Sequence, residues 1–500
     1  MADREWREAA DLKPSTLWLS VTLAAAGVLR LWSPGHGIPW AVGGIEASIA
    51  SRVLTVMRTG DFNPHGFELP GLLFALHLPI AIARYLVGAV RGEWTSLAQI
   101  DVDQLLPWMR IATGLIGVAT VFLVHQVALR WGARHALLSA ALMAVMPLHV
   151  AESHDASPTV PVAFFVTLTL LTSLAASERR ALRLFATAGA MAGLATATNY
   201  GGVLALVLPA MAAWLTVPAR PSRLAYVMAA LSAWLLVFLL ASPFTVLDLP
   251  GFLNGFGDFM ARFRAAGGQA GRTWLIDLRH LQQALGWPAL VLMFAGIGMG
   301  LTRSVRGPGR ERWTLLTVFP LVAYAVIAMR GAGEPRSLVP LMPFACVLAS
   351  LAVISGVSLL RRFSIPRAVR TTLIVALTVA ALLPPSIGAG RHARDLRRPT
   401  PARQAWEWIA REVPPGETVA VERGAVRLPP LRYDARPLER DTAWDAAELT
   451  RGGVRWVVQS VPDTRNDPRA DLPPPGVLEV ARFVPAPGRR EPALRILVVR

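Results

Sequence analysis

Acidic and imidazole side chains gather in two stretches of this chain that lie between long apolar runs. The first stretch contains Glu46, Asp61, His65 and Glu68, and the second, the sequence AESHDASPTVP at 151–161, contains Glu152, His154 and Asp155. A carboxylate held beside a hydroxyl nucleophile can act as a general base. Histidines among carboxylates can also bind a divalent cation. The plainer alternative is that short loops are polar because they contact water.

The chain lacks the motifs of several enzyme classes that bind nucleotides or zinc. It contains no G-x-G-x-x-G, no G-K-[ST] loop and no H-E-x-x-H. The single cysteine, Cys346, lies in an apolar run, which excludes disulfides within the chain and thiolate metal clusters. The net charge of +17 comes from arginines in short clusters between apolar runs. That distribution indicates a membrane protein rather than a nucleic-acid-binding face.

The elements that must position these side chains are membrane helices. Hydrophobic residues make up 53% of the chain and charged residues 17%, against about 25% charged in a typical soluble protein. Apolar runs long enough to cross a bilayer lie at about 17–32, 107–129, 135–150, 159–176, 184–199, 201–217, 224–243, 286–302, 313–330, 337–360 and 370–388. We therefore expect an α-helical polytopic membrane protein with about eleven transmembrane helices.

The arginines predict the orientation of these helices, because short cytoplasmic loops are rich in arginine. Every second connection carries a cluster, and the alternate short connections carry none. The clusters are Arg130 and Arg134; Arg179, Arg180 and Arg183; Arg220 and Arg223; Arg303, Arg306, Arg310 and Arg312; and Arg361, Arg362, Arg367 and Arg370. We therefore expect a plasma (inner) membrane protein with a cytoplasmic N-terminus and an extracytoplasmic C-terminal domain.

Two long extracytoplasmic loops follow from this orientation, at 33–106 and 244–285. The apolar run 69–90 would reverse every later arginine cluster if it crossed the bilayer, so we expect a helix on the outer surface; a plain twelfth span is the alternative. Within the same loop, Ile45, Ile49, Val53, Leu54 and Met57 recur at helical spacing. That spacing predicts an amphipathic helix ending at Gly60.

The chain divides into a membrane domain at 1–390 and a small soluble α/β domain at 391–500. Residues 401–412 have helical spacing and are followed by Pro-Pro-Gly. Strand-like runs lie at 418–422, 454–459, 477–484 and 494–499. The soluble domain contains no recognisable catalytic motif.

In the order of its features the sequence resembles the membrane glycosyltransferases of the GT-C class, in particular the protein O-mannosyltransferase and aminoarabinose transferase branch (glycosyltransferase family 39-like). The resemblance extends over most of residues 17–360. The matching pieces are Ile45–Ala47, Arg58–Pro64, Phe67–Leu73, Arg110, the second outer loop (146–150, Ser153-His154 and 160–165) and the sequence EPRSLVPLMP at 334–343. Three positions depart from the family pattern: the two family aspartates align with Ile45 and Thr159, and a family proline aligns with Gly71.

The resemblance implies transfer of a sugar from a polyprenyl phosphate, held by its lipid tail in the outer leaflet, to a hydroxyl of a protein, lipid or glycan. It implies a carboxylate as the general base, for which Glu46 is our first candidate and Asp155 the second. Arg336 is our candidate for binding the lipid phosphate, because the planar guanidinium group matches phosphate oxygens. His65, His154, Arg110 and Glu68 complete the candidate substrate-binding residues. A divalent cation held by the two histidines with Glu46 and Asp155 is a further hypothesis.

Two other functions remain open from the sequence. A non-catalytic relative that binds a polyprenyl lipid or a partner glycosyltransferase is one, because the family aspartates are replaced. A lipid or solute transporter is the other, although the expected spans contain no Asp, Glu or Lys, which ion-coupled transporters usually carry.

Overall fold

The protein is an integral membrane protein with many helices, as predicted. The computed structural model describes residues 2–40, 44–218, 220–267, 273–307, 309–329, 333–359, 365–422, 424–429, 432–438, 446–461, 476–485 and 492–499. Among these residues, eight helices are long and apolar enough to cross a membrane, and the segments Thr16–Arg30 and Tyr200–Thr216 form two shorter apolar helices. The chain separates into two compact units, which are described in turn.

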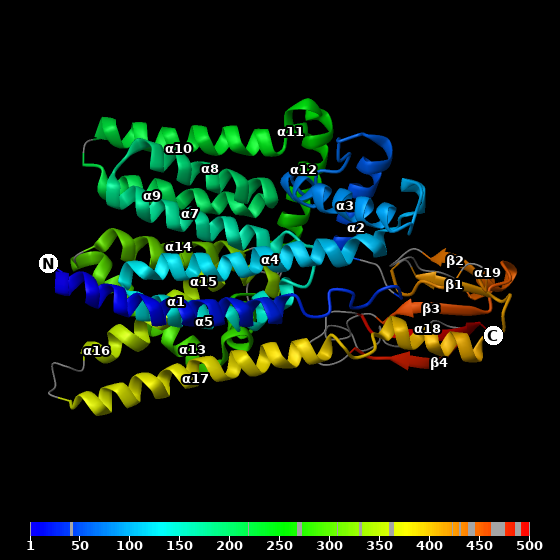
Figure 1. Ribbon diagram of the computed structural model, residues 1–500. Coiled ribbons are helices and arrows are strands. Elements are labelled where there is room, and N and C mark those ends of the chain that lie inside the picture. The colour runs from blue at the N-terminus through cyan, green and yellow to red at the C-terminus, as the bar shows by residue number, and fades with distance from the viewer. Residues whose placement is uncertain are drawn as a thin grey trace. The chain divides into compact units, whose positions relative to one another are not determined.

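The first unit comprises 1–32, 55–87 and 108–390 and is a bundle of long helices (Figure 1). The helices that begin or lie in it are α1 (Ala2–Arg30), α3 (Leu72–Val90), α5 (Ala133–Ala144), α6 (Pro147–Glu152), α7 (Thr159–Arg179), α8 (Leu182–Thr198), α9 (Val207–Thr216), α10 (Arg220–Ala241), α11 (Phe244–Leu247), α12 (Leu249–Gly267), α13 (Thr273–Arg306), α14 (Arg310–Met329), α15 (Met342–Leu351), α16 (Val357–Leu359) and α17 (Arg367–Asp395). Short 3₁₀ helices η2 (Leu129–Trp131), η3 (Tyr200–Leu206) and η5 (Pro335–Leu341), and the π-helical turn η6 (Ala352–Gly356), join them.

Four helices have residues in both units: α2 (Gly44–Thr59), α3, α4 (Val102–Ala128) and α17. The predicted amphipathic helix of the first loop is confirmed as α2, which buries Ile49, Val53 and Leu54 and ends before Gly60. Gly60 has φ +72°, a backbone conformation that favours glycine.

The predicted spans match the helices with two informative differences. The expected single helix over 135–150 is wrong as a continuous element, because α5 ends at Ala144 and Pro147 begins the separate helix α6. A proline has no amide hydrogen to continue the helix, so the chain turns there. In α13 the backbone kinks at Gly286 (φ +70°), where the predicted span 286–302 begins.

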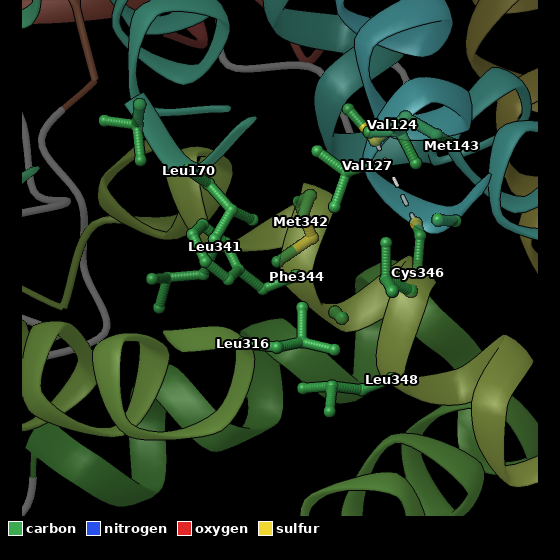
Figure 2. Close-up of a cluster of buried hydrophobic side chains, with 14 of the residues drawn as sticks. Val124, Val127, Met143, Leu170, Leu316, Leu341, Met342, Phe344, Cys346 and Leu348 are labelled. Atoms are coloured by element: carbon green, nitrogen blue, oxygen red, sulfur yellow. Dashed lines mark hydrogen bonds between the residues drawn. The ribbon is translucent and has the colours of Figure 1, made fainter. Parts of the chain in front are cut away.

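The core of the bundle is centred on α15, whose residues are all buried. Figure 2 shows Met342, Phe344 and Cys346 among apolar side chains of α4, α5, α7 and α14. The thiol of Cys346 contacts the sulfur of Met143 on α5 at 3.9 Å. A helix that is apolar on every side is suited to such a central position.

Helices α8 and α10 pack closely because small residues face the partner backbone. Gly189 and Gly193 of α8 are four residues apart and therefore lie on one face. A Cβ atom at Gly189 would collide with the carbonyl of Ala230, and one at Gly193 would lie 2.7 Å from the carbonyl oxygen of Trp234. Glycines at this spacing are typical of close helix pairs in membranes.

The arginine-rich connections meet at one end of the bundle. Arg130, after α4, forms an ion pair of 2.9 Å with Glu178 at the end of α7. Arg312, at the start of α14, donates to the carbonyl oxygen of Arg130 at 2.8 Å, and Tyr226 of α10 donates to that of Arg180 at 3.0 Å. The predicted clustering of these loops on one side is therefore seen in the contacts, whereas Arg361 and Arg362 lie outside the described residues.

The helix α3 lies at the end of the bundle that is opposite the arginine-rich connections. Residues near its start and in its second half both contact that end. Before its start, the amide of Gly71 donates to Ser242 at 2.9 Å, just beyond α10. Near its end, Arg84 lies over the ring of Trp108, close to the start of α4, at 5.9 Å. In Figure 1, α3 lies at the same end of the bundle as α11 and α12. Although α3 is long and apolar enough to cross a membrane, these contacts favour the surface-helix interpretation.

The second unit comprises 33–54, 88–107 and 391–500. Its five-stranded sheet has the order β2-β1-β3-β5-β4, built from β1 (Thr418–Glu422), β2 (Asp434–Leu438), β3 (Trp456–Ser460), β4 (Val477–Phe483) and β5 (Leu494–Val499). The strand β1 pairs in parallel with β2 and β3, and β5 pairs antiparallel with β3 and β4. The register places Val457 opposite Leu497. The predicted mixed α/β domain is thus confirmed, although β2 was not predicted.

Helices cover both faces of this sheet. The apolar side of α18 (Pro401–Glu412) packs on one face with Val419, Val458 and Ile496. On the other face, Leu449 of α19 (Ala446–Arg451) packs with Val457 and Leu497. The sheet therefore has a two-sided core within a small domain.

Residues 33–54 and 88–107, the second of which contains the 3₁₀ turn η1 (Leu97–Gln99), pack with the C-terminal residues in this unit. The amide of Arg427 donates to the carbonyl oxygen of Trp40 at 2.8 Å, and its guanidinium forms ion pairs with Asp101 (2.9 Å) and Asp103 (3.5 Å). Arg403 of α18 lies 4.9 Å from the centre of the Trp40 ring. The loop residues and the soluble residues thus form a single packed body.

Candidate functional site

In the first unit a polar cluster joins the turn after α2 to the segment between α11 and α12. His65 and Asp61 lie 2.6 Å apart through Nε2 and Oδ2. Asn63 donates from Nδ2 to Asp248, which lies between α11 and α12, at 2.9 Å. Asp61 and Asn63 accept backbone amides two residues ahead, as turn-forming residues do. The cluster forms because Gly60 releases the chain from α2 into a turn.

Both carboxylates of this cluster favour their ionised form. The hydrogen bond from His65 holds the pKa of Asp61 below its usual value, and the amide of Asn63 adds to the effect. For Asp248 the main cause is the side-chain amide of Asn63, followed by the backbone amide of Gly251. Donated hydrogen bonds stabilise a carboxylate relative to the neutral acid.

Glu68 lies at the end of the first loop beside an aromatic group. Its charge acts on Tyr200, whose hydroxyl donates to the carbonyl oxygen of Phe67 at 3.0 Å. The ring of Tyr200 packs against Phe256 and Phe259 of α12 with centroid distances of 5.3 and 5.2 Å. The aromatic packing fixes the loop next to the start of α3 and leaves Glu68 exposed.

The second acidic loop is a compact turn rather than a solvated connection. Glu152 ends α6 and is 1% exposed, and His154 is 2% exposed. The Nδ1 atom of His154 hydrogen-bonds the carbonyl oxygen of Val150 at 2.8 Å. Asp155, in contrast, is half-buried. Of the three titratable side chains in this turn, Asp155 is therefore the one that a substrate can reach.

Arg336 lies close to this turn, because η5 packs against α6. The charges of Glu152 and Asp155 act on its guanidinium group. The same group binds Glu334 through two hydrogen bonds, from Nε at 2.8 Å and from a terminal nitrogen at 3.1 Å. Both partners of this pair are about half exposed, at 46% and 45%. Two of the predicted site residues, Asp155 and Arg336, are thus near each other.

The remaining candidates stand elsewhere in the fold. Arg110 lies in the third turn of α4 and is 4% exposed. Glu46 lies in the first turn of α2, in the part of that helix that belongs to the second unit. His65 pairs with Asp61 instead of with Glu46 or Asp155.

The structure does not assemble the metal site that the histidines suggested. Within the described residues, no group of three or more His, Cys, Asp or Glu side chains is arranged to hold a metal ion. The pairing of His65 with Asp61 and the burial of His154 explain why these two histidines do not combine.

Three polar residues of interest were missed by the sequence analysis. Asp248 joins the first-loop cluster although it lies 185 residues from Asn63 in the chain. Asp277 is fully buried near the start of α13, with His280 at 3.9 Å. Arg30, the last residue of α1, is 1% exposed. For Asp248 and Asp277 the usable signal was their position in the long predicted loop 244–285, and Arg30 had none.

Comparisons with known proteins found similarity to one family model and to several solved structures. Residues 103–246 match the family described as dolichyl-phosphate-mannose-protein mannosyltransferase. The matched segment contains Arg110 and the turn with Asp155. No curated protein sequence matches the chain.

Solved structures share the fold over nearly the whole chain. The structure of ArnT from Cupriavidus metallidurans bound to undecaprenyl phosphate is 17% identical, covers 96% of this chain and 97% of its own, and has a TM-score of 0.56. The oligosaccharyltransferase from Archaeoglobus fulgidus in the apo form is 14% identical, covers 91% of this chain and 70% of its own, and has a TM-score of 0.54. The predicted GT-C resemblance of the fold is confirmed.

Proposed function

From the match of residues 103–246 to the mannosyltransferase family and from the shared fold of the whole chain with ArnT, we propose that this protein is a membrane glycosyltransferase. Its donor is a sugar on a polyprenyl phosphate, and its acceptor is a hydroxyl group. The observation that carries the proposal is the proximity of Arg336 to the half-buried Asp155, a cation beside an acid at the end of the bundle opposite the arginine-rich loops. ArnT was crystallised with undecaprenyl phosphate, a lipid phosphate of the proposed class.

The proposed reaction divides the work between charge and proton transfer. The acceptor oxygen forms a bond to the anomeric carbon, and the bond from that carbon to the phosphate oxygen breaks with its electron pair. The lipid phosphate leaves with added negative charge, which Arg336 neutralises. A carboxylate accepts the acceptor proton, a contribution of roughly 10²–10⁴-fold to the rate. Asp155 and Glu46 are our two candidates for that carboxylate.

The proposed orientation places the acidic turns outside the cell and the arginine-rich end inside. It follows from the excess of arginine in short cytoplasmic loops. A membrane-impermeant thiol reagent applied to intact cells tests it, because the native Cys346 is buried. Cysteines at positions 46 and 155 are expected to react before lysis, and a cysteine at position 183 only after lysis. Reaction of 46 and 155 only after lysis, or from opposite sides, would contradict the orientation.

The enzymatic proposal is tested by purifying the protein and supplying a panel of polyprenyl-phosphate sugars. Turnover of one donor is expected, with Glu46→Gln abolishing transfer if Glu46 is the base and Asp155→Asn abolishing it if Asp155 is. The matched control is Glu178→Gln, which removes an acid at the arginine-rich end and is expected to retain activity. Full activity in both Glu46→Gln and Asp155→Asn would exclude both candidates. Absence of turnover with every donor would favour a non-catalytic lipid-binding relative.

A further inference from the structure

A buried arginine lies behind the acidic turn. Arg30 ends α1 and is 1% exposed. Its terminal nitrogens donate to the carbonyl oxygens of Ala144 and Met143, each at 2.8 Å, and one of them lies 3.2 Å from Nδ1 of His149. It therefore binds the end of α5 and the middle of α6 at once.

The break between α5 and α6 explains why a cation is stable there. In an uninterrupted helix the carbonyl of Met143 would accept from residue 147, but Pro147 has no amide hydrogen. The amide of Met146 reaches that carbonyl only at 3.4 Å. The last carbonyls of a helix also carry the negative end of its dipole, which attracts a cation. The planar fork of Arg30 satisfies two such carbonyls together.

The contacts continue from Arg30 to the turn itself. Because Arg30 donates to His149, the Nδ1 atom of that ring must be the acceptor. The hydroxyl of Ser153 donates to the carbonyl oxygen of His149 at 2.7 Å. Ser153 is also the residue after Glu152, two positions before Asp155. A chain of buried hydrogen bonds thus runs from α1 to the turn.

Two other helices pack closely against the turn. A Cβ atom at Gly117 of α4 would lie 2.7 Å from the hydroxyl oxygen of Ser153 and 2.9 Å from Cδ of Arg30. One at Gly388 of α17 would lie 2.8 Å from Pro147. The turn is therefore enclosed by α4 and α17 and packs against η5, which carries Arg336.

We propose that Arg30 is a positioning residue that holds the α6 turn so that Asp155 stays beside Arg336. The inference rests on the proposed glycosyltransferase function, since it assigns a role to Arg30 in that same site. Arg30 touches neither the donor nor the acceptor. Its removal takes away the two 2.8 Å hydrogen bonds to the last carbonyls of α5 and the contact with His149, and leaves Met143 with the long bond from Met146, so we expect the turn to shift. A displacement of about 1 Å at a reacting group can lower the rate roughly 10²-fold.

The test combines transfer kinetics with a spectroscopic probe on the turn. A nitroxide is attached to a cysteine at the half-buried position 151 of α6, and Arg30→Met is compared with Arg30→Lys. Arg30→Met is expected to lower kcat roughly 10²-fold with a small change in donor KM, and to increase the mobility of the nitroxide. Arg30→Lys, which keeps the charge but loses the fork, is expected to lie between Arg30→Met and the parent. Arg183→Met, an exposed arginine of α8, is the matched control and leaves both readouts unchanged.

The outcomes separate the proposed role of Arg30 from the proposed glycosyltransferase function. An unchanged nitroxide spectrum and an unchanged kcat in folded Arg30→Met would overturn the inference, and so would increased mobility with an unchanged kcat. If the parent protein transfers no sugar from any donor, the proposed function fails, while the spectrum still reports whether Arg30 holds the turn. If Arg30→Met does not fold, Gly117→Ala decides: it keeps the buried charge but displaces Ser153, and an unchanged kcat there would contradict the role of the turn.

Discussion

The ion pair between Arg336 and Glu334 allows two substitutions with opposite expected effects on transfer. Arg336→Ala removes the cation proposed to meet the lipid phosphate. Glu334→Gln keeps the size of the side chain and removes the carboxylate that accepts from two of the three nitrogens of the guanidinium group. If the phosphate must replace Glu334 at Arg336, the first change weakens catalysis and the second strengthens it.

The magnitudes follow from the geometry of the pair. Hydrogen bonds to charged groups contribute about 1.5–3 kcal/mol, so we expect Arg336→Ala to lower kcat/KM for the donor about 10- to 150-fold. The pair with Glu334 is half exposed, and such pairs contribute about 0–1 kcal/mol. Release of Arg336 by Glu334→Gln is therefore expected to raise kcat/KM by at most about fivefold.

The assay is transfer from a single polyprenyl-phosphate sugar in detergent or nanodiscs, with kcat and KM measured separately. Because the leaving phosphate gains charge in the transition state, the loss in Arg336→Ala is expected in kcat as well as in KM. Raising the salt concentration should reduce the gain from Glu334→Gln, since exposed ion pairs are screened. A fall in kcat/KM with Glu334→Gln equal to that of Arg336→Ala would refute the reasoning, because the pair would then act as a structural unit.

Three further predictions concern the scaffold. Gly189→Ala places a methyl group against the backbone of α10 and is expected to destabilise the protein by about 1–3 kcal/mol. Gly298 has open space around it, so Gly298→Ala should stabilise its helix by about 0.5–1 kcal/mol. Thermal unfolding followed by circular dichroism distinguishes the two variants. The pKa of Asp61 is lowered by its hydrogen-bonded histidine, so the contact should persist above the ordinary aspartate pKa of about 3.9 and be lost as the pH falls through the lowered pKa. A nitroxide on the neighbouring residue should then become mobile only in acid, but at every pH in Asp61→Asn. Thr400→Ala removes the side-chain acceptor at the start of α18 and should cost about 1 kcal/mol, measured as earlier exchange of the amide hydrogens of α18; unchanged exchange would contradict the cap.

Hydropathy and arginine distribution were sufficient to predict the helices and the sharing of one end by the arginine-rich loops. Each membrane helix satisfies its backbone hydrogen bonds within itself, so a continuous apolar run in the sequence is enough to identify it. The break at Pro147 was less visible, because the residues on both sides of it are apolar. The edge strand β2 was missed since its residues are exposed and include Pro437, which conflicts with the usual signals of a strand.

The candidate site was predicted only in part, because its contacts join residues far apart in the chain. The acids and Arg336 could be recognised by type and loop position. The partner of Asn63 lies in another loop, and no local pattern indicates Asp248. Arg30 looks in the sequence like a helix-end arginine at a membrane surface. Its burial depends on α5 ending where it does, which is a property of the packed bundle.

The packing of Trp40 and Asp101 with Arg427 affects how this protein could be recombined with a relative. The natural unit of exchange is not the continuous C-terminal stretch. A chimera that receives residues 391–500 alone would inherit a domain whose indole and carboxylate partners come from a foreign chain. Grafting 33–54 and 88–107 together with that stretch keeps all three partners from one parent. Related proteins should accordingly vary these three segments in concert, even though more than 280 residues separate the second from the third.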